Sequence, residues 1–289
     1  MKYDKMLMLL TLVAAGLAAG CSDDEDPLKD WTGPSKPGTE IKTPAEVGNR
    51  VVAHRGGSTE AGTRQFPDNS VAALNYAIGL GCYASECDIY LTKDDDVVVA
   101  HASAGGYINN LKPWEHTLAE LRAATRLWLD VKNITIDGKS TEEGREASAR
   151  ACERACEIIE EMGAQNFCEF IVTGNATKIS SSSPVTIWQR SLAAAGAVGS
   201  NAGWMSFRNP ADYISYGYPW ANLSTENLYF EGKTVNKNGY SVQKFLDAGL
   251  KLSVYNADLD VDMDYYLAYK DKLYAICTNY PRKLLGKWN

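Results

Sequence analysis

The sequence predicts an α/β fold in which strands and helices alternate around a parallel sheet. From Arg50 onward, short runs rich in β-branched residues alternate with longer segments of helical character, which is the pattern of successive βα units. Roughly 240 residues take part, a length that suits one large barrel or two small domains. Hydrophobic residues make up 45% of the chain, which is enough for a substantial core.

The expected elements follow one another along the chain. Strands are predicted at residues 50–53, 84–91, 97–100, 127–131, 169–172, 185–188, 251–255 and 274–278. Helices are predicted at residues 70–80, 117–124, 141–162, 191–198, 241–248 and 263–270. Ser70 is a candidate N-cap, and Gly81 and Gly249 are candidate helix stops. In the Tyr-, Trp- and Asn-rich segment 203–239 we expect a strand at 211–216.

The first twenty residues have the features of a signal peptide. Lys2 and Lys5 precede an apolar run at residues 6–15 that is too short to span a bilayer. Residues 17–21, Leu-Ala-Ala-Gly-Cys, resemble a bacterial lipobox, in which cleavage before the cysteine allows that residue to be acylated. We therefore expect residues 1–20 to be a lipoprotein signal peptide and Cys21 to be the lipidation site. An ordinary secretory signal is the alternative.

A tether is expected between the anchor and the folded part. Residues 21–45 begin with an acidic stretch and continue with many Pro, Gly, Lys and Asp residues but no apolar periodicity. The folded part then spans residues 46–289. These features predict an exported protein, held by a lipid on a bacterial membrane at its periplasmic or cell-surface face.

The charge balance argues against a nucleic-acid partner. The net charge is −7, and no basic stripe is present to neutralise phosphates. Small-molecule or lipid-derived substrates fit better, and the oligomeric state stays open. The six cysteines beyond Cys21 lie mostly inside apolar runs, so we expect buried free thiols.

A His-Arg pair follows the first predicted strand. The sequence His54-Arg55-Gly56-Gly57 comes directly after the apolar residues 51–53. A guanidinium offers parallel donors to a phosphate, and an imidazole can move a proton near neutral pH. Polar residues at the carboxyl end of a barrel strand are typical of an active site, although a histidine satisfied within the core is the alternative.

Two carboxylates share one face of the next strand. Glu86 and Asp88 are two residues apart, so their side chains point the same way. Because the two charges would repel, a divalent cation with oxygen ligands between them is the economical interpretation. A surface-facing acidic pair on an edge strand is the alternative.

A hairpin is expected to bring a second histidine to these carboxylates. If Asp94 and Asp95 are its two loop residues, the strands pair so that Asp88 lies opposite His101. A change of one residue in the loop would move His101 to the other face. The third histidine, His116, is expected at a helix start.

Residues 51–101 resemble the N-terminal signature of the glycerophosphodiester phosphodiesterase family. The family's His-Arg-Gly, Pro-Glu-Asn-Thr-like turn, Glu-x-Asp strand, Leu-Thr-Lys-Asp hairpin and closing His appear in the same order, as His54-Arg55-Gly56, Pro67-Asp68-Asn69-Ser70, Glu86-Cys87-Asp88, Leu91-Thr92-Lys93-Asp94 and His101. Near the end of the chain, residues 276–281, Ile-Cys-Thr-Asn-Tyr-Pro, resemble the family's Thr-Asp-x-Pro close. The likeness therefore spans the whole folded part.

This resemblance implies a TIM-type (βα)8 barrel over residues 46–289, with a β-hairpin after the second strand. It also implies one divalent metal ion, with Mg²⁺ or Ca²⁺ favoured. Glu86 and Asp88 become metal ligands, and Arg55 becomes a phosphate contact. His54 and His101 become the general acid and base.

The family's third metal carboxylate lies in a Glu-x-Lys strand, which Asp130 and Lys132 match here. Asp130 is one methylene shorter than Glu, and Lys132 would contact the substrate phosphate. Tyr255 stands where an aromatic-lined ligand strand is usual, so we expect it to bind substrate. Further departures from the family pattern are Asp68, Ala102 and Asn279.

The implied reaction is metal-dependent hydrolysis of glycerophosphodiesters to glycerol 3-phosphate and an alcohol. One alternative keeps the barrel but acts on lysophospholipids or as a phospholipase D-like phosphodiesterase, suggested by the anchor and the aromatic residues 204–229. Another is a non-catalytic surface ligand-binding lipoprotein, motivated by Asp130, Ala102 and Asn279. The leaving alcohol and the order of the two proton transfers stay open.

Overall fold

A computed structural model of the chain describes residues 47–101, 116–117, 126–132, 135–136, 139–140, 142–161, 168–173, 186–187, 202–205, 209–218, 220–231 and 239–288. The chain divides into two units, residues 1–32 and 33–289, and every element below belongs to the second. The predicted signal peptide, Cys21 and the tether lie outside the described residues.

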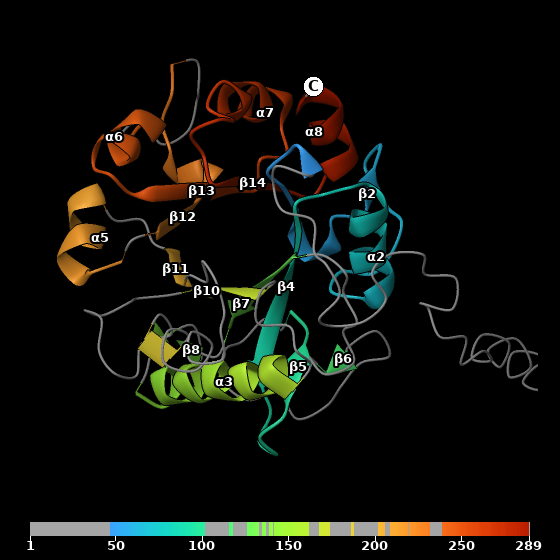
Figure 1. The fold of residues 1–289 in the computed structure, drawn as a ribbon, viewed down its shortest axis with the longest axis vertical. Coiled ribbons are helices and arrows are strands. Elements are labelled where there is room, and N and C mark those ends of the chain that lie inside the picture. Colours follow the sequence, from blue (N-terminus) through green and yellow to red (C-terminus); the bar gives the residue numbers. More distant parts are fainter. Residues whose placement is uncertain are drawn as a thin grey trace, which may run out of the picture. The chain divides into compact units, whose positions relative to one another are not determined.

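Eight parallel strands in the described part of the chain form a closed ring (Figure 1). They are β1 (Val51–Ala53), β4 (Ala84–Leu91), β7 (Arg126–Val131), β10 (Cys168–Thr173), β11 (Ala202–Met205), β12 (Trp220–Ser224), β13 (Lys251–Tyr255) and β14 (Ala275–Thr278). Each pairs in parallel with the next, and β1 pairs with both β14 and β4, which closes the ring. The predicted TIM-type barrel is confirmed.

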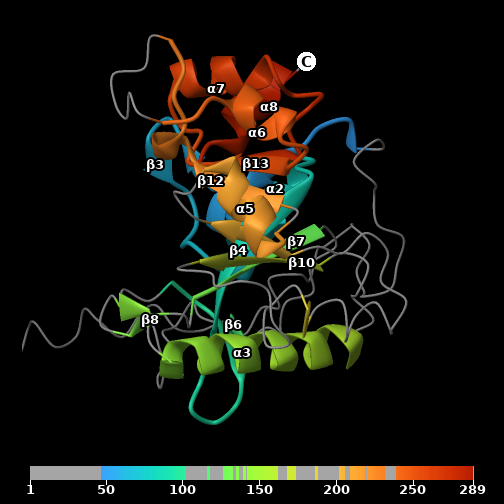
Figure 2. The same ribbon diagram turned by 90° about the vertical axis from the view of Figure 1, so that its left-hand side faces the viewer.

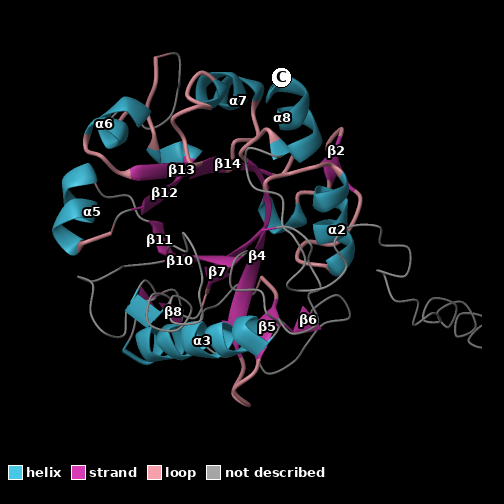
Figure 3. Ribbon diagram, in the orientation of Figure 1, coloured by secondary structure: helices cyan, strands magenta, loops and turns pink. Residues whose placement is uncertain are grey.

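Helices lie outside this ring (Figure 3). They are α2 (Val71–Gly79), α3 (Glu142–Glu161), α5 (Pro210–Tyr216), α6 (Val242–Asp247), α7 (Asp260–Leu267) and α8 (Pro281–Trp288), with the short 3-10 turns η1 (His54–Gly56) and η3 (Thr225–Asn227). Figure 2 shows α6, α7 and α8 grouped on one side of the barrel and α3 on the other. None of the described helices is long and apolar enough to cross a membrane.

The predicted helix ends of α2 and α6 are confirmed. Ser70 Oγ accepts the Ala73 N–H at 3.2 Å. Ser241 caps α6 in the same way, and Gly81 and Gly249, with φ of 78° and 77°, follow the two helices. A side-chain oxygen at this position satisfies an N–H that the helix itself leaves without a partner.

A hairpin follows the second barrel strand, as predicted. The strand β5 (Val97–Val99) runs antiparallel to β4, and β6 (His116–Thr117) adds to β5. Two further two-stranded sheets are formed by β2 (Thr59–Glu60) with β3 (Thr63–Arg64) and by β8 (Thr135–Ile136) with β9 (Lys139–Ser140).

The predicted register of this hairpin is wrong by one residue. Leu91 pairs with Val97, and the Ala100 N–H, not His101, bonds to the Asp88 carbonyl at 3.0 Å. The loop has an odd number of residues because Asp95 adopts a left-handed φ of 64° and its N–H bonds back to the Thr92 carbonyl at 3.2 Å. His101 therefore lies beyond the end of β5.

Several other predicted elements are corrected. Residues 211–216, expected as a strand, belong to α5, because Asn209 caps its first turn, Pro210 opens the helix and Gly217 ends it with a φ of 87°. Residues 186–187, within the expected strand 185–188, are helical.

His116, expected at a helix start, lies in β6 with Thr117, the first residue of the helix predicted at 117–124. The rest of that helix and the one predicted at 191–198 lie outside the described residues. The helix predicted at 263–270 begins and ends three residues earlier, and β11, β12 and α8 were not predicted.

Large aromatic side chains fill the interior of the ring. Trp128 of β7 and Trp220 of β12 meet edge to face, with ring centroids 5.1 Å apart. Tyr274 stacks on Trp128 with an interplanar angle of 6°. All six cysteines beyond Cys21 are buried free thiols, as predicted.

Candidate active site

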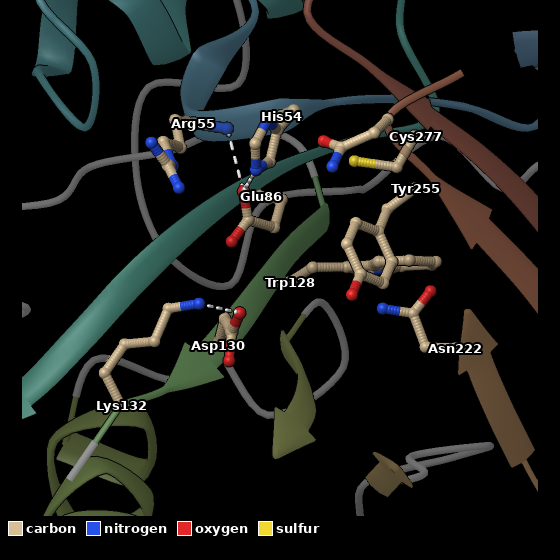
Figure 4. Close-up of a pocket in the computed structure, with 10 residues that line it drawn as sticks. His54, Arg55, Glu86, Trp128, Asp130, Lys132, Asn222, Tyr255 and Cys277 are labelled. Atoms are coloured by element: carbon tan, nitrogen blue, oxygen red, sulfur yellow. Dashed lines mark hydrogen bonds and ion pairs between the residues drawn. The ribbon is translucent and has the colours of Figure 1, made fainter. Parts of the chain in front are cut away.

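A pocket of about 140 Å³ is lined by residues of five barrel strands, β4, β7, β12, β13 and β14, and by residues that directly follow β1, β7 and β13. Figure 4 shows how these side chains converge. They are His54, Arg55, Glu86, Trp128, Asp130, Lys132, Asn222, Tyr255, Asn256 and Cys277. Polar groups that meet at one end of a barrel in this way are the usual arrangement of an active site in this fold.

The turn after β1 has an unusual backbone. Arg55, Gly56 and Gly57 adopt positive φ values of 53°, 85° and 48° in succession. A Cβ on Gly56 would lie 2.5 Å from the Ala73 Cβ, so the glycine is needed for α2 to pack against this turn. The turn aims the Arg55 N–H at Glu86 Oε2, to which it donates a hydrogen bond of 2.8 Å.

Three buried carboxylates converge in the site. One oxygen from each of Glu86, Asp88 and Asp130 lies within 4.8 Å of the others. Burial raises the pKa of Glu86 well above its usual value, and the charges of Asp88 and Asp130 raise it further. Hard oxygen ligands with excess negative charge fit a divalent cation, so these residues could hold one. Glu86 and Asp88 point to the same side of β4, as their spacing of two residues predicted.

Two cations flank the carboxylates. Lys132 Nζ hydrogen-bonds to Asp130 Oδ2 and lies 3.0 Å from Asp88 Oδ1. Burial opposes its charge, but Asp130 and Asp88 outweigh burial and raise the pKa of Lys132 above its usual value. Arg55 Nε lies 3.1 Å from Asp88 Oδ2. Although burial raises the pKa of Asp88, Lys132 and Arg55 bring it below its usual value.

His54 lies against the carboxylate cluster. Its Nε2 is 3.9 Å from Glu86 Oε2, and its Nδ1 is 3.0 Å from Asn279 Oδ1. Burial lowers the pKa of His54 to about 4, and the Arg55 guanidinium acts in the same direction. The imidazole is therefore neutral at physiological pH and available to accept a proton.

His101 reaches the site despite the register correction. The residue follows β5 and is exposed, and its charge interacts with those of Asp88 and Asp130. Partial burial lowers the pKa of His101, an effect that Asp88 opposes. It does not line the pocket, whereas His54, whose side chain is 16% exposed, does.

Asn69 had no predicted role, although it lies in the turn that resembles the family's Pro-Glu-Asn-Thr motif. Asn69 Nδ2 donates to Asp88 Oδ2 at 3.0 Å, and its Oδ1 accepts the Asp88 N–H at 2.9 Å. It adopts a φ of 61°, which Asn tolerates better than most residues. The side chain thus holds Asp88 in position from a different element.

Other pocket residues divide into predicted and unpredicted ones. Tyr255, predicted to bind substrate, lines the pocket, and burial raises its pKa to about 12, so the phenol keeps its proton. Asn222, Trp128 and Cys277 line the pocket without having been predicted. The strand of Asn222 was not predicted, and the strands of Trp128 and Cys277 were predicted without a role for these two residues.

The model of the glycerophosphoryl diester phosphodiesterase family matches residues 54–175, the segment that carries both histidines, all three carboxylates and both cations. These residues carry the family's domain. The chain is therefore a phosphodiester hydrolase by class. No curated protein matches the sequence of the chain.

Solved structures of similar fold are described as phosphodiesterases. A glycerophosphodiester phosphodiesterase from Parabacteroides distasonis aligns with a TM-score of 0.60 at 17% identity, covering 83% of this chain and 96% of that chain. A phosphodiesterase from Oleispira antarctica, solved in complex with the product sn-glycerol-3-phosphate, aligns with a TM-score of 0.55 at 18% identity, covering 82% and 95%. At these identities the likeness shows that the chain shares their fold.

Proposed function

We propose that the chain hydrolyses glycerophosphodiesters to glycerol 3-phosphate and an alcohol, with one divalent metal ion and two histidines. The observation that carries the proposal is the cluster of Glu86, Asp88 and Asp130 beside a pocket that His54 and Lys132 line. The product bound in the Oleispira relative is sn-glycerol-3-phosphate, a phosphate monoester like the product proposed for this chain.

In this reaction the chain's own cations offset charge on the substrate. Arg55 and Lys132 donate hydrogen bonds to the phosphoryl oxygens as negative charge builds on them. Glu86, Asp88 and Asp130 would hold the metal ion, which would supply positive charge beside the phosphoryl group. One histidine takes the proton of the nucleophile, which is water or the neighbouring glycerol hydroxyl, and the other protonates the leaving alcohol.

The size of the pocket favours a small substrate. A volume of about 140 Å³ lies below the range of roughly 300–1,000 Å³ that is usual for larger ligands. Seven of its ten lining residues are polar or charged, and Tyr255 and Trp128 are the aromatic ones. A glycerophosphate group suits this lining better than an acyl chain does.

A substrate panel tests the proposal. The full chain, supplied in turn with Mg²⁺, Ca²⁺ and Mn²⁺, is incubated with glycerophosphocholine, glycerophosphoethanolamine, glycerophosphoinositol and lysophospholipids. We expect glycerol 3-phosphate from the glycerophosphodiesters and little turnover of the lysophospholipids. Preferred turnover of lysophospholipids would favour the lipid-directed alternative, and no turnover with any metal would favour a binding protein.

We also propose that the chain is anchored to a bacterial membrane by lipid on Cys21. The support is the sequence alone: Lys2 and Lys5, the apolar run, and the lipobox-like residues 17–21. Mass spectrometry of the detergent-extracted protein should find an acylated N-terminal cysteine. Cys21→Ser should release the chain from the membrane fraction, and an unmodified cysteine in the wild type would contradict the proposal.

A further inference from the structure

Asp258 lies between β13 and α7, outside the predicted site and outside the pocket that holds His54. Its carboxylate accepts three hydrogen bonds from the last residue of β14 and the residue that follows it. Thr278 Oγ1 and the Asn279 N–H both donate to Oδ1 at 2.8 Å. The Asn279 side-chain Nδ2 donates to Oδ2 at 2.7 Å. A carboxylate with donors on both oxygens fixes the segment around it.

These contacts determine which way the Asn279 amide faces. Its NH2 group must point at Asp258, because the reverse orientation would place two acceptor oxygens against each other. The amide oxygen therefore faces His54, with Oδ1 at 3.0 Å from Nδ1. An amide oxygen only accepts hydrogen bonds, so Nδ1 of His54 must carry a proton.

The position of this proton decides what His54 offers the substrate. In the neutral imidazole only one nitrogen is protonated, so Nε2 keeps its lone pair. Nε2 is the nitrogen on the carboxylate side of the ring, 3.9 Å from Glu86 Oε2. The ring is thus presented to the pocket as a proton acceptor.

We propose that Asp258 and Asn279 form a positioning pair that holds neutral His54 in its Nδ1–H tautomer, so that Nε2 accepts the proton of the nucleophile. The inference rests on the proposed hydrolysis and refines it. The N–H bond formed at Nε2 replaces the O–H bond of the nucleophile, whose oxygen forms a new P–O bond. The P–O bond to the leaving alcohol breaks, and protonated His101 supplies the proton that this alcohol takes up. Asp258 touches no reacting atom and acts only through Asn279.

The two residues depend on each other. With Asp at both positions, two carboxylates would meet where Asn279 Nδ2 and Asp258 Oδ2 now lie 2.7 Å apart, and they would repel. With Asn at both, neither amide has its orientation fixed by a carboxylate. An exchange of the two, Asp258→Asn with Asn279→Asp, keeps one acid and one amide and gives Nδ1 an acceptor again.

A double-mutant cycle in the full chain tests the pair. The variants are Asp258→Asn, Asn279→Asp and the exchange of both, with Asp264→Asn as the matched control, because Asp264 is an exposed acid of the nearby helix α7 that pairs with Lys287. The kcat and KM for glycerophosphocholine are measured together with Tm. The histidine tautomers are read from nitrogen NMR shifts, with His54→Gln assigning the signal.

We expect each single variant to lose about ten-fold or more in kcat with KM within two-fold, and the exchange to recover to within about three-fold of wild type. The NMR spectra should show Nδ1–H in the wild type and a mixture of tautomers in Asp258→Asn. Single variants with the kcat of Asp264→Asn, or losses that multiply in the exchange, would overturn the proposal. So would an Nε2–H tautomer in the wild type, a result that does not require the chain to turn over any substrate.

Discussion

Burial and the neighbouring Arg55 guanidinium lower the pKa of His54 to about 4, so the folded chain binds this proton less readily than the unfolded chain does. His54 therefore stabilises the fold fully above its ordinary pKa of 6.5. That stability is lost as the pH falls from 6.5 toward 4, because the unfolded chain takes up the proton first.

We predict that the chelator-treated wild type loses up to about 3 kcal/mol of unfolding free energy over this pH range relative to His54→Gln. Urea unfolding at pH 7, 6, 5 and 4 measures it. The comparison with His54→Gln removes the contributions of carboxylates such as Glu86, which titrate in both proteins. Parallel pH profiles for the two proteins would mean that His54 is not held neutral by the fold.

Both site histidines are predicted to matter for turnover. Replacing His54 or His101 with Ala should lower kcat by about 10² to 10⁴, because each removes one proton transfer. His116→Ala is the control, since His116 lies in β6 and has no assigned role. Near-full turnover in His101→Ala would show that a different group protonates the leaving alcohol.

Among individual residues, the sequence predicts a role in the site best where the interacting residues are close along the chain. Glu86 and Asp88 follow from strand parity, because they lie two residues apart on one strand. Asn69 and Asp258 could not be predicted, because their roles depend on contacts across 19 and 21 residues with other elements. His101 was expected in the site through a register that proved wrong, and it reaches the site from beyond β5.

Among the elements, the turn after β1 is the one most constrained by packing. Gly56 has a φ of 85° and no room for a Cβ against Ala73 of α2. Gly62, in the β2–β3 hairpin, has a similar φ of 81° but open space around it. Substitutions at these two positions therefore distinguish the cost of a left-handed backbone from the cost of a steric clash.

We predict that Gly62→Ala costs about 1–2 kcal/mol, the strain of a left-handed alanine. Gly56→Ala should cost about 1–3 kcal/mol more, because α2 must also move. Urea unfolding of the two variants measures the difference, and turnover should fall only in Gly56→Ala. Equal destabilisation would mean that α2 packs less tightly against the turn than the structure indicates.

Element prediction succeeds where apolar periodicity is uninterrupted and fails where a loop or cap decides. The strand at residues 84–91 has the predicted bounds. The segment 211–216 was predicted as a strand, but Asn209 caps and Pro210 opens a helix there. The hairpin was predicted, but its register depended on the left-handed conformation of Asp95, which the sequence does not specify.

At the scale of the whole barrel, closure brings the two ends of the ring together. The pairing of β1 with β14 places Asn279 beside His54, 225 residues away in sequence. The direct pairing of β4 with β7 sets their carboxylates next to each other, with Asp88 opposite Asp130. The fold class followed from alternating elements and family motifs, but the contact between Asn279 and His54 exists only once the ring is closed.

A metal ion that binds this cluster must also stabilise the folded chain. At a metal concentration about 100 times its dissociation constant, we predict a gain of about 2.7 kcal/mol, or roughly 5–10 °C in Tm, for the chelator-treated protein. Glu86→Gln should abolish most of this shift, and Asp264→Asn, which changes an exposed acid, should keep it. Equal shifts in all three proteins would place the metal elsewhere.

The release of glycerol 3-phosphate from glycerophosphocholine by the chelator-treated chain, before and after Mg²⁺ or Ca²⁺ is restored, tests the account most directly. We predict almost no product without metal, strong recovery when metal is added to the wild type, and no recovery in Glu86→Gln. Product release that is unaffected by chelation, or undiminished in Glu86→Gln, would contradict a metal-assisted reaction at these three carboxylates.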